Sequence, residues 1–201
     1  EFNNKKVYTL HGGLYHIEEY CEHDTTNRSV ITAYIKKYLN DVGISTDFKQ
    51  KLNATQHLIT FVEQLPFFAR VYNIANESLH KIFGIGLGER FTQPLVEFYL
   101  SAQDLNYPML GVNHLLGFKL IKESQIMQIQ TLVKRVNDII HALLHFHDLH
   151  LATIDIYLGQ DDNSDIIIVG EFSPTSFTCW KNNSSLSDDI VYANLLQRMQ
   201  H

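Results

Sequence analysis

The sequence predicts an α+β fold with a β-rich first half and a helical second half. The first hundred residues contain short runs rich in β-branched and aromatic residues, separated by polar and glycine-containing segments, as is typical of strands and turns. In the second hundred, apolar residues recur every three or four positions over a long segment, which indicates an amphipathic helix. With 201 residues, 45% of them hydrophobic, the chain is long enough for one domain or a compact two-lobed unit.

Strands and one helix are expected in the first half. Residues 6–19 predict a β-hairpin that turns at His11-Gly12-Gly13, and residues 29–39 predict a third antiparallel strand. Residues 46–65 carry apolar side chains at mostly helical spacing before Pro66, which predicts a helix. Short apolar runs punctuated by glycines predict further strands at residues 70–74, 79–84 and 93–100.

The second half is expected to be mainly helical. Residues 124–147 show the most regular apolar stripe of the chain and predict a long helix. A compact hairpin follows, with strands at residues 155–158 and 165–169 around a polar turn. Residues 187–199 predict a last helix, with Ser187 or Asp188 as its N-cap.

Charge and cysteine content argue against several classes of partner and location. The net charge of -6 gives no basic face for nucleic acid or an anionic membrane. No stretch approaches the roughly 20 apolar residues of a membrane span, and the N-terminal residues do not resemble a secretory signal. Two widely spaced cysteines suit a reduced compartment. We therefore expect an intracellular protein, cytoplasmic or nuclear, without nucleic acid or membrane partners.

Five short motifs follow one another along the chain. They are Ala-Tyr-Ile-Lys at residues 33–36, Leu-Val-Glu-Phe at 95–98, Ala-Leu-Leu-His-Phe-His at 142–147, Val-Gly-Glu-Phe-Ser at 169–173 and Ser-Asp-Asp-Ile at 187–190. In their order and spacing they resemble protein kinases. The first is similar to the Val-Ala-Ile-Lys strand, the second to the strand that enters the hinge, and the fourth to Ile-Gly-Asp-Phe-Gly.

The resemblance implies a two-lobed arrangement and a set of site residues. Residues 1–100 would form a β-rich N-lobe with one helix, and residues 101–201 a reduced C-lobe that stops in its first large helix. Vestigial nucleotide-binding residues would be Gly12, Gly13, Lys36, Val96, Glu97 and Phe98. Vestigial metal-binding residues would be Asp155 and Glu171.

The same resemblance implies that catalysis has been lost. Only Gly12 and Gly13 stand where a kinase has three spaced glycines over the phosphates. No complete His-Arg-Asp-x-x-x-x-Asn occurs, because different registers put Asp148 or Asp155 in the position of the base. Glu171 replaces the metal-binding aspartate, and its extra methylene moves the carboxylate by roughly 1.5 Å. Binding of ATP and Mg²⁺ is therefore expected to be weak or absent.

These expectations favour a pseudokinase that acts as a regulatory scaffold. Apolar surface normally covered by later C-lobe helices would be exposed, which predicts association with another protein or with a second copy. One alternative is a divergent active kinase that uses Lys36, Asp155 and Glu171 with Mg-ATP. A second alternative is an unrelated α+β interaction domain.

Two other patterns suggest sites but have simpler interpretations. His145, His147, His150 and Asp148 are metal-ligating residue types, but their spacing at a helix end does not place all the histidines on one face. The glycines at positions 84, 86 and 88 are followed by Pro94 rather than a helix pattern, so a hairpin turn is favoured over a dinucleotide-binding loop.

Overall fold

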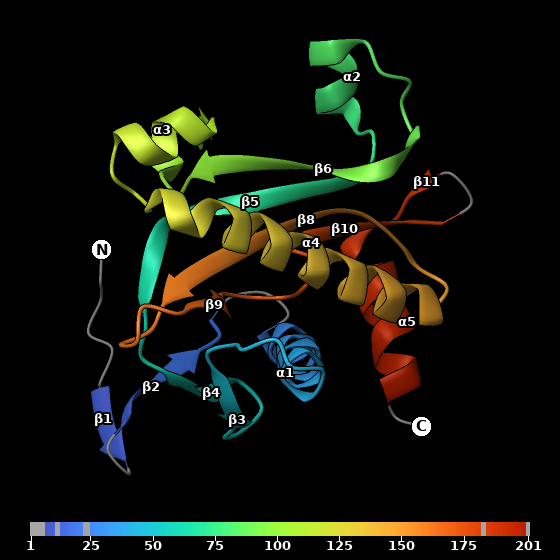
Figure 1. The fold of residues 1–201 in the computed structure, drawn as a ribbon. Helices are drawn as coiled ribbons and strands as arrows, with labels where there is room; N and C mark the ends of the chain where they lie inside the picture. Colours follow the sequence, from blue (N-terminus) through green and yellow to red (C-terminus); the bar gives the residue numbers. More distant parts are fainter. Residues whose placement is uncertain (1–6, 11–12, 22–24, 182–183, 200–201) are drawn as a thin grey trace. The chain divides into compact units, whose positions relative to one another are not determined.

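The computed structural model describes residues 7–10, 13–21, 25–181 and 184–199, which fold into two compact units. The first unit comprises Glu1–Gln64 and Leu158–Ser173, and the second comprises Leu65–Tyr157 and Pro174–His201. The boundary predicted after residue 100 falls within the second of these units. Both contain strands and helices (Figure 1), which confirms the α+β class.

The first unit is built on an antiparallel sheet with strand order β1-β2-β4-β3. These strands are β1 Val7–Leu10, β2 Gly13–Glu19, β3 Phe48–Lys51 and β4 Gln56–Thr60. Leu10 pairs with Gly13, which confirms the predicted N-terminal hairpin. Helix α1, Thr25–Asp41, packs against β3 and β4 and buries Ile31, Ile35 and Leu39.

The later segment of the first unit contains β9, Ile166–Val169, whose four residues are all buried. Thr46 forms a parallel bridge with Ile168. The Asp47 amide donates to the Ile168 carbonyl at 3.0 Å, and the Ile168 amide donates to the Ser45 carbonyl at 3.0 Å. The entry into β3 is therefore held by a segment more than a hundred residues away in sequence.

The second unit is built on most of the larger sheet, whose strand order is β11-β10-β8-β5-β6-β7, with β9 paired to β8 outside this order. Its strands are β5 Glu63–Ile74, β6 Arg90–Leu100, β7 Met109–Leu110, β8 His150–Gln160, β10 Phe177–Lys181 and β11 Ser184–Ser185. Its helices are α2 Glu77–Phe83, the 3₁₀ turn η1 Gln103–Leu105, α3 Val112–Gly117, α4 Glu123–Phe146 and α5 Asp188–Met199.

Helix α4 lies along the sheet of the second unit (Figure 1). Its buried residues include Ile129, Val133 and Ile140, which recur at helical spacing. Asn137 faces the sheet and exchanges two hydrogen bonds with Asn73 on β5, at 2.8 and 3.0 Å. The long helix predicted at residues 124–147 is therefore confirmed, and its one buried amide is satisfied.

Two predicted elements of the first unit have the wrong secondary structure. Residues 29–39, predicted as a strand, belong to α1, because Ile31, Ile35 and Leu39 are four residues apart and share one helical face. Residues 46–65, predicted as a helix, form β3 and β4 and enter β5. Asn53 makes the turn between them by accepting from the Thr55 amide at 2.9 Å.

One predicted strand of the second unit is also wrong. Residues 79–84 lie in α2 and its C-cap. The Asn76 side chain caps the helix by accepting from the Leu79 amide at 3.1 Å, and Gly84 ends it at φ 68°. The segment 84–88 therefore links a helix to β6 instead of turning between two strands. Strands at residues 70–74 and 93–100, the hairpin strands at 155–158 and 165–169, and the last helix correspond to β5, β6, β8, β9 and α5.

None of the helices within the described ranges combines the length and the apolar character needed to cross a bilayer.

Ile140→Ala should lower the free energy of unfolding by about 2–5 kcal/mol, because Ile140 is completely buried on α4 and truncation leaves a cavity. Met127→Ala on the same helix should change it by less than about 0.5 kcal/mol, because Met127 is 77% exposed. Urea unfolding followed by the fluorescence of Trp180, the one tryptophan of the chain, measures both. Equal effects would show that α4 does not supply the core.

Candidate functional site

A fully buried lysine lies at the centre of the first unit. Lys36 on α1 is 0% exposed, and its Nζ lies 2.7 Å from Asp47 Oδ1 and 4.0 Å from Glu18 Oε2. Burial lowers the pKa of the ammonium, but the carboxylates of Asp47 and Glu18 outweigh burial and raise the pKa above its usual value. Lys36 therefore remains charged and holds both carboxylates near it.

A polar cluster extends from this pair to His57 on β4. Glu18 accepts a hydrogen bond from the Tyr20 hydroxyl at 3.2 Å and lies 4.0 Å from His57 Nδ1. His57 Nε2 lies 2.9 Å from Ser29 Oγ. Burial lowers the pKa of His57 to about 4, partly offset by Glu18. His57 is therefore neutral near pH 7.

The buried polar residues of α1 also hold the segment that follows β9. Ser29, Thr32 and Lys36 are spaced three and four residues apart, so they form a polar stripe on one face of the helix. Thr32 Oγ1 donates to the Phe172 carbonyl at 3.1 Å and accepts from the Phe172 amide at 3.2 Å. The backbone next to Glu171 is thereby attached to α1.

A cavity of about 390 Å³ lies beside this cluster. Glu18 and Asp47 form its acidic side. The remaining wall includes the apolar side chains of Ile59, Phe61, Val62 and Val169 together with Gly170. Such a mainly apolar cavity with a few polar groups is the usual form of a small-molecule site.

Glu171, predicted to bind a metal, is held by an arginine. Arg28 Nε and Nη2 donate to its two carboxylate oxygens at 2.7 and 2.6 Å. The Ser173 hydroxyl donates to Glu171 Oε1 as well. This two-point geometry is the strongest form of arginine–carboxylate pairing.

Asp155, the other predicted metal residue, is held in the same way in the second unit. Arg70 Nε and Nη2 donate to its two oxygens at 2.6 Å each. The hydrogen bonds to Asp155 are the main reason why the pKa of Arg70 is raised. The pair borders a polar cavity of about 250 Å³, which Thr153, Thr178 and Asn76 also line.

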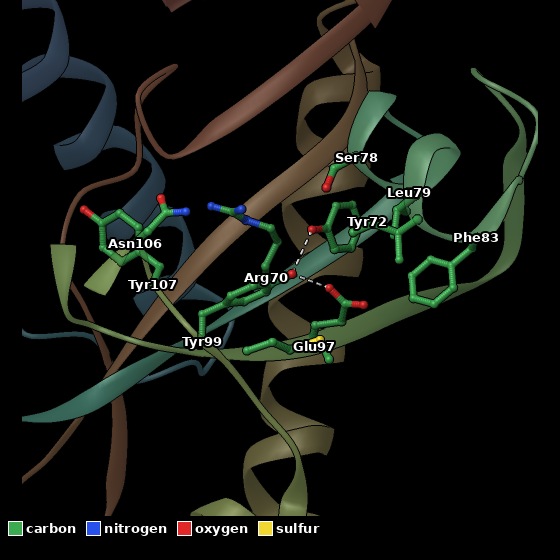
Figure 2. A pocket seen from close by; sticks show the side chains of 11 residues that line it. Arg70, Tyr72, Ser78, Leu79, Phe83, Glu97, Tyr99, Asn106 and Tyr107 are labelled. Carbon is green, nitrogen blue, oxygen red and sulfur yellow. Dashed lines mark hydrogen bonds between the residues drawn. The ribbon is translucent and has the colours of Figure 1, made fainter. Parts of the chain in front are cut away.

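A second cavity of the same unit, about 390 Å³ in volume, has aromatic walls (Figure 2). Its floor carries a chain of hydrogen bonds from Tyr72 through Tyr99 to Glu97, with oxygen–oxygen distances of 3.2 and 2.5 Å. Burial, followed by the hydrogen bond to Glu97, raises the pKa of Tyr99. The guanidinium of Arg70 packs 5.1 Å from the centre of the Tyr99 ring.

The predicted nucleotide-binding residues lie in different parts of the chain. Lys36 lies in the first unit, and Gly13 begins β2 opposite Leu10. Gly12 lies outside the described residues. Val96, Glu97 and Phe98 lie on β6 in the second unit, where Phe98 is buried and Glu97 lines the aromatic cavity. The nucleotide and metal roles assigned to these residues stay predictions.

Lys36 and Glu171 belong to one unit, and the charge of Glu171 contributes to the raised pKa of Lys36.

The histidine-rich segment at the end of α4 places the rings of His145 and His150 5.6 Å apart. In the described part of the chain, no group of three or more histidines, cysteines, aspartates or glutamates is arranged to hold a metal ion.

Sequence reasoning missed the residues that bind the predicted carboxylates. Arg28 and Glu171 are 143 residues apart, and Arg70 and Asp155 are 85 apart. Neither arginine belongs to a short motif, so no local pattern marks the pairs. The carboxylates Glu18 and Asp47 were missed because the segments that carry them were not expected to meet at Lys36.

Comparisons with known proteins identify a different family from the one expected. A sequence model described as SAICAR synthetase matches residues 22–196. A phosphoribosylaminoimidazole-succinocarboxamide synthase from Staphylococcus aureus is 32% identical over 165 residues, which cover 82% of this chain and 70% of that protein. The namesake protein of Wolbachia pipientis from Culex pipiens is 30% identical over 169 residues, with the same coverage.

Solved structures agree on the fold. The synthase of Ehrlichia chaffeensis superposes with a TM-score of 0.83 at 24% identity and covers 100% of this chain and 92% of its own. A SAICAR synthetase in complex with ADP gives a TM-score of 0.85 at 21% identity, and the superposition covers 99% of this chain and 96% of that one.

These matches correct the functional expectations. The assignment to a pseudokinase, the scaffold function and the absence of enzymatic activity are wrong, since the relatives are named as synthases. The expectation of weak or absent ATP and Mg²⁺ binding is contradicted by the match to the SAICAR synthetase family model, and a protein of the same fold is known in complex with ADP. Neither the divergent kinase nor the unrelated interaction domain fits the matches better.

The kinase resemblance failed for a structural reason. The Ala-Tyr-Ile-Lys motif at residues 33–36, compared with a kinase strand, lies on helix α1. Residues 46–65, expected to form the one helix of a kinase-like N-lobe, form strands β3 and β4 and enter β5. The motif that carried the nucleotide-binding lysine and the predicted N-lobe helix had therefore been matched to elements of the wrong type.

The neutral state of His57 predicts a pH dependence of stability. The folded-state pKa of about 4 lies below the ordinary value of 6.5, so the unfolded chain binds a proton that the folded chain does not. The free energy of unfolding should therefore fall as pH decreases from about 6.5 to about 4. In His57→Gln this part of the slope should be absent.

Urea unfolding followed by circular dichroism at a series of pH values measures the difference between the two proteins. Met127→Ala is the control, since Met127 is exposed, carries no titratable group and belongs to the other unit, so it should leave the slope unchanged. Identical pH slopes for the wild type and His57→Gln would contradict a buried neutral imidazole.

Proposed function

The chain belongs to the SAICAR synthetase family, and from this premise we propose that it is an ATP-dependent ligase that forms phosphoribosylaminoimidazole-succinocarboxamide with Mg²⁺ as cofactor. The observation that carries the proposal is the family match, which spans residues 22–196. The ADP complex of a protein with the same fold supports ATP as the cosubstrate.

The name of the product defines the bond that must form. A succinocarboxamide joins a ring carboxyl group to the nitrogen of a succinate unit, which is the amide expected when the amine of aspartate is acylated. Direct condensation in water is unfavourable, so the carboxylate is first phosphorylated by ATP. The amine then attacks the carbonyl carbon, the C–N bond forms, and phosphate leaves with the former carboxylate oxygen. ATP ends as ADP and phosphate, and the amine loses a proton.

The cavity beside Lys36 is proposed as the place of the nucleoside. Its apolar walls suit a flat purine ring, and Phe61 is 44% exposed at its edge. Lys36 is buried under the acidic side and paired with Asp47, so its proposed role is to position Asp47 and Glu18 rather than to contact phosphate. This revises the role that the sequence suggested for Lys36.

The carboxylates at this cavity fit Mg²⁺ better than they fit bare phosphate. Its described lining residues include Glu18, Asp47 and Glu63 but no lysine or arginine. Mg²⁺ is commonly bound by one or two carboxylates together with substrate phosphates. Glu63 is exposed and would hold the ion with Glu18, and the bound ion would neutralise phosphate charge. Asp155 and Glu171 would first have to release their arginines.

The polar cavity beside Arg70 is proposed for an anionic part of the other substrates. Arg70 retains 34% side-chain exposure beside Asp155, and the hydroxyls of Thr153 and Thr178 line the same space. Arginine and hydroxyl groups together are common ligands of carboxylate and phosphate oxygens. A cytoplasmic location, where ATP is available, forms part of the proposal. Association with a second copy or another protein remains a prediction.

The proposal predicts that ADP raises the melting temperature and that Phe61→Ala weakens ADP binding about five- to tenfold, because it removes one aromatic wall. Titration calorimetry with Mg²⁺ present measures the affinity. Phe146→Ala is the matched control, since Phe146 is exposed and belongs to the other unit. Equal losses of ADP affinity in the two variants would show that the nucleoside does not bind in this cavity.

The activity itself is measured by mass spectrometry of the product. The protein is incubated with ATP, Mg²⁺, aspartate and phosphoribosylaminoimidazole carboxylate, and product and ADP should form in equal amounts only when all four are present. A protein that binds ADP yet forms no amide would contradict the ligase function without affecting the nucleotide site.

A further inference from the structure

We propose that a cluster of three histidines and one arginine at the end of helix α4 binds a phosphoryl group. The cluster consists of His141 and His145 on α4, His150 at the start of β8 and Arg90 at the start of β6. All four residues belong to the second unit, and none of them lines any of the three cavities described above. The site therefore goes beyond the proposed ligase function and does not depend on it.

The fold brings the three imidazoles together at one point. His141 and His145 are four residues apart, so they are neighbours on one face of α4. The chain then turns back from α4 into β8 (Figure 1), and the centre of the His150 ring lies 5.6 Å from the centre of the His145 ring. His145 is exposed and the other two are partly exposed. A ligand from solution can therefore reach all three rings.

Arg90 adds a permanent positive charge to this cluster. Burial lowers the pKa of His150, and the charge of Arg90 is the next cause, followed by the other two histidines. Burial also lowers the pKa of His141, followed by repulsion from His145. Arg90 adds to this repulsion, and Asp138 opposes it. His141 and His150 are therefore mostly neutral near pH 7 as long as no anion reduces the repulsion.

Acidic side chains leave the charge of Arg90 largely uncompensated. Among the described residues, no carboxylate oxygen lies within 4.0 Å of its guanidinium nitrogens. Asp138, the acid that acts on His141, also accepts a hydrogen bond from Asn137 at 3.5 Å. On the neighbouring strand β10, the residue opposite His150 is the uncharged Trp180. An anion would therefore meet a cluster whose positive charge is not already neutralised.

The donors of the cluster fit a phosphoryl group better than a carboxylate. A guanidinium binds two oxygens of one anion at once, and each imidazole offers a further N–H donor. A carboxylate has only two oxygens, so Arg90 would occupy both, whereas a phosphoryl group has a third for the imidazoles. A phosphate ester takes its second negative charge near pH 6, where imidazoles become protonated. Binding should therefore raise the histidine pKa values and should strengthen as pH falls from about 8 to about 6.5.

Nuclear magnetic resonance of the histidine side chains in the whole chain tests the proposal, with two rings assigned through His141→Gln and His150→Gln. At constant ionic strength, about 50 mM inorganic phosphate should raise the pKa of His141 and His150 by about 0.5 or more relative to chloride. Acetate should cause less than about a third of that shift, because it has only two oxygens. Absence of a shift in phosphate, or an equal shift in acetate, would overturn the proposal.

Glycerol 2-phosphate distinguishes the two sources of a phosphoryl group, the free ion and a phosphorylated molecule. Equal shifts from glycerol 2-phosphate and inorganic phosphate would support a site that accepts the phosphoryl group of a larger molecule. A shift from inorganic phosphate alone would support a site for the free ion. This readout is local to the histidines, so a failure of the ligase assay leaves it unaffected.

Arg90→Gln should remove at least about two-thirds of the phosphate-induced pKa shift, because it removes the two-point donor. Lys122→Gln is the matched control, since it removes one exposed positive charge at the opposite end of the 24-residue helix α4 and should keep the full shift. Circular dichroism confirms that both variants fold. A full shift in folded Arg90→Gln, or equal losses in the two variants, would contradict binding of the phosphoryl group by Arg90.

Discussion

The buried ion pair between Lys36 and Asp47 is the interaction on which the first unit depends. An ammonium group with no exposure to water is costly unless a carboxylate compensates it, and Asp47 does so at 2.7 Å. Their pairing connects helix α1 to the start of β3, which the backbone of Ile168 holds from the other side. Glu18 on β2 is attracted by the same ammonium group, since its Oε2 lies 4.0 Å from Lys36 Nζ. The charge of Lys36 thus holds together α1, β2 and the segment that enters β3. It thereby positions the two carboxylates that form the acidic wall of the cavity.

Two arginine–carboxylate pairs also join segments that are far apart in the sequence. Arg28 binds Glu171 within the first unit, and Arg70 binds Asp155 within the second, each through two short hydrogen bonds. Both carboxylates had been expected to contact a metal, and in the structure each already has a cationic partner. The carboxylates better placed to meet a ligand are Glu63 and Glu97, which line cavities without an arginine partner among the described residues.

Short sequence patterns correctly predicted those elements whose buried residues recur at regular spacing along the chain. The stripe containing Ile129, Val133 and Ile140 predicted α4, because each turn contributes one inward residue. Helix α1 was missed because its β-branched residues favour strands in isolation, and packing against β3 and β4 overrides that preference. Lys36 was selected from a motif that was assigned to a strand, whereas it lies on helix α1. The ion pairs that form the sites join residues far apart in sequence, so no local signal could reveal them.

A double-mutant cycle at Lys36 and Asp47, measured as the free energy of unfolding, tests the structural role of the pair most directly. Lys36→Met and Asp47→Leu should each lower the free energy of unfolding by about 3–5 kcal/mol, because each leaves the other charge buried and unpaired. The double variant should be much less destabilised than the sum of the two. Additive effects, or a neutral Lys36→Met, would contradict a charged lysine buried at the centre of this unit.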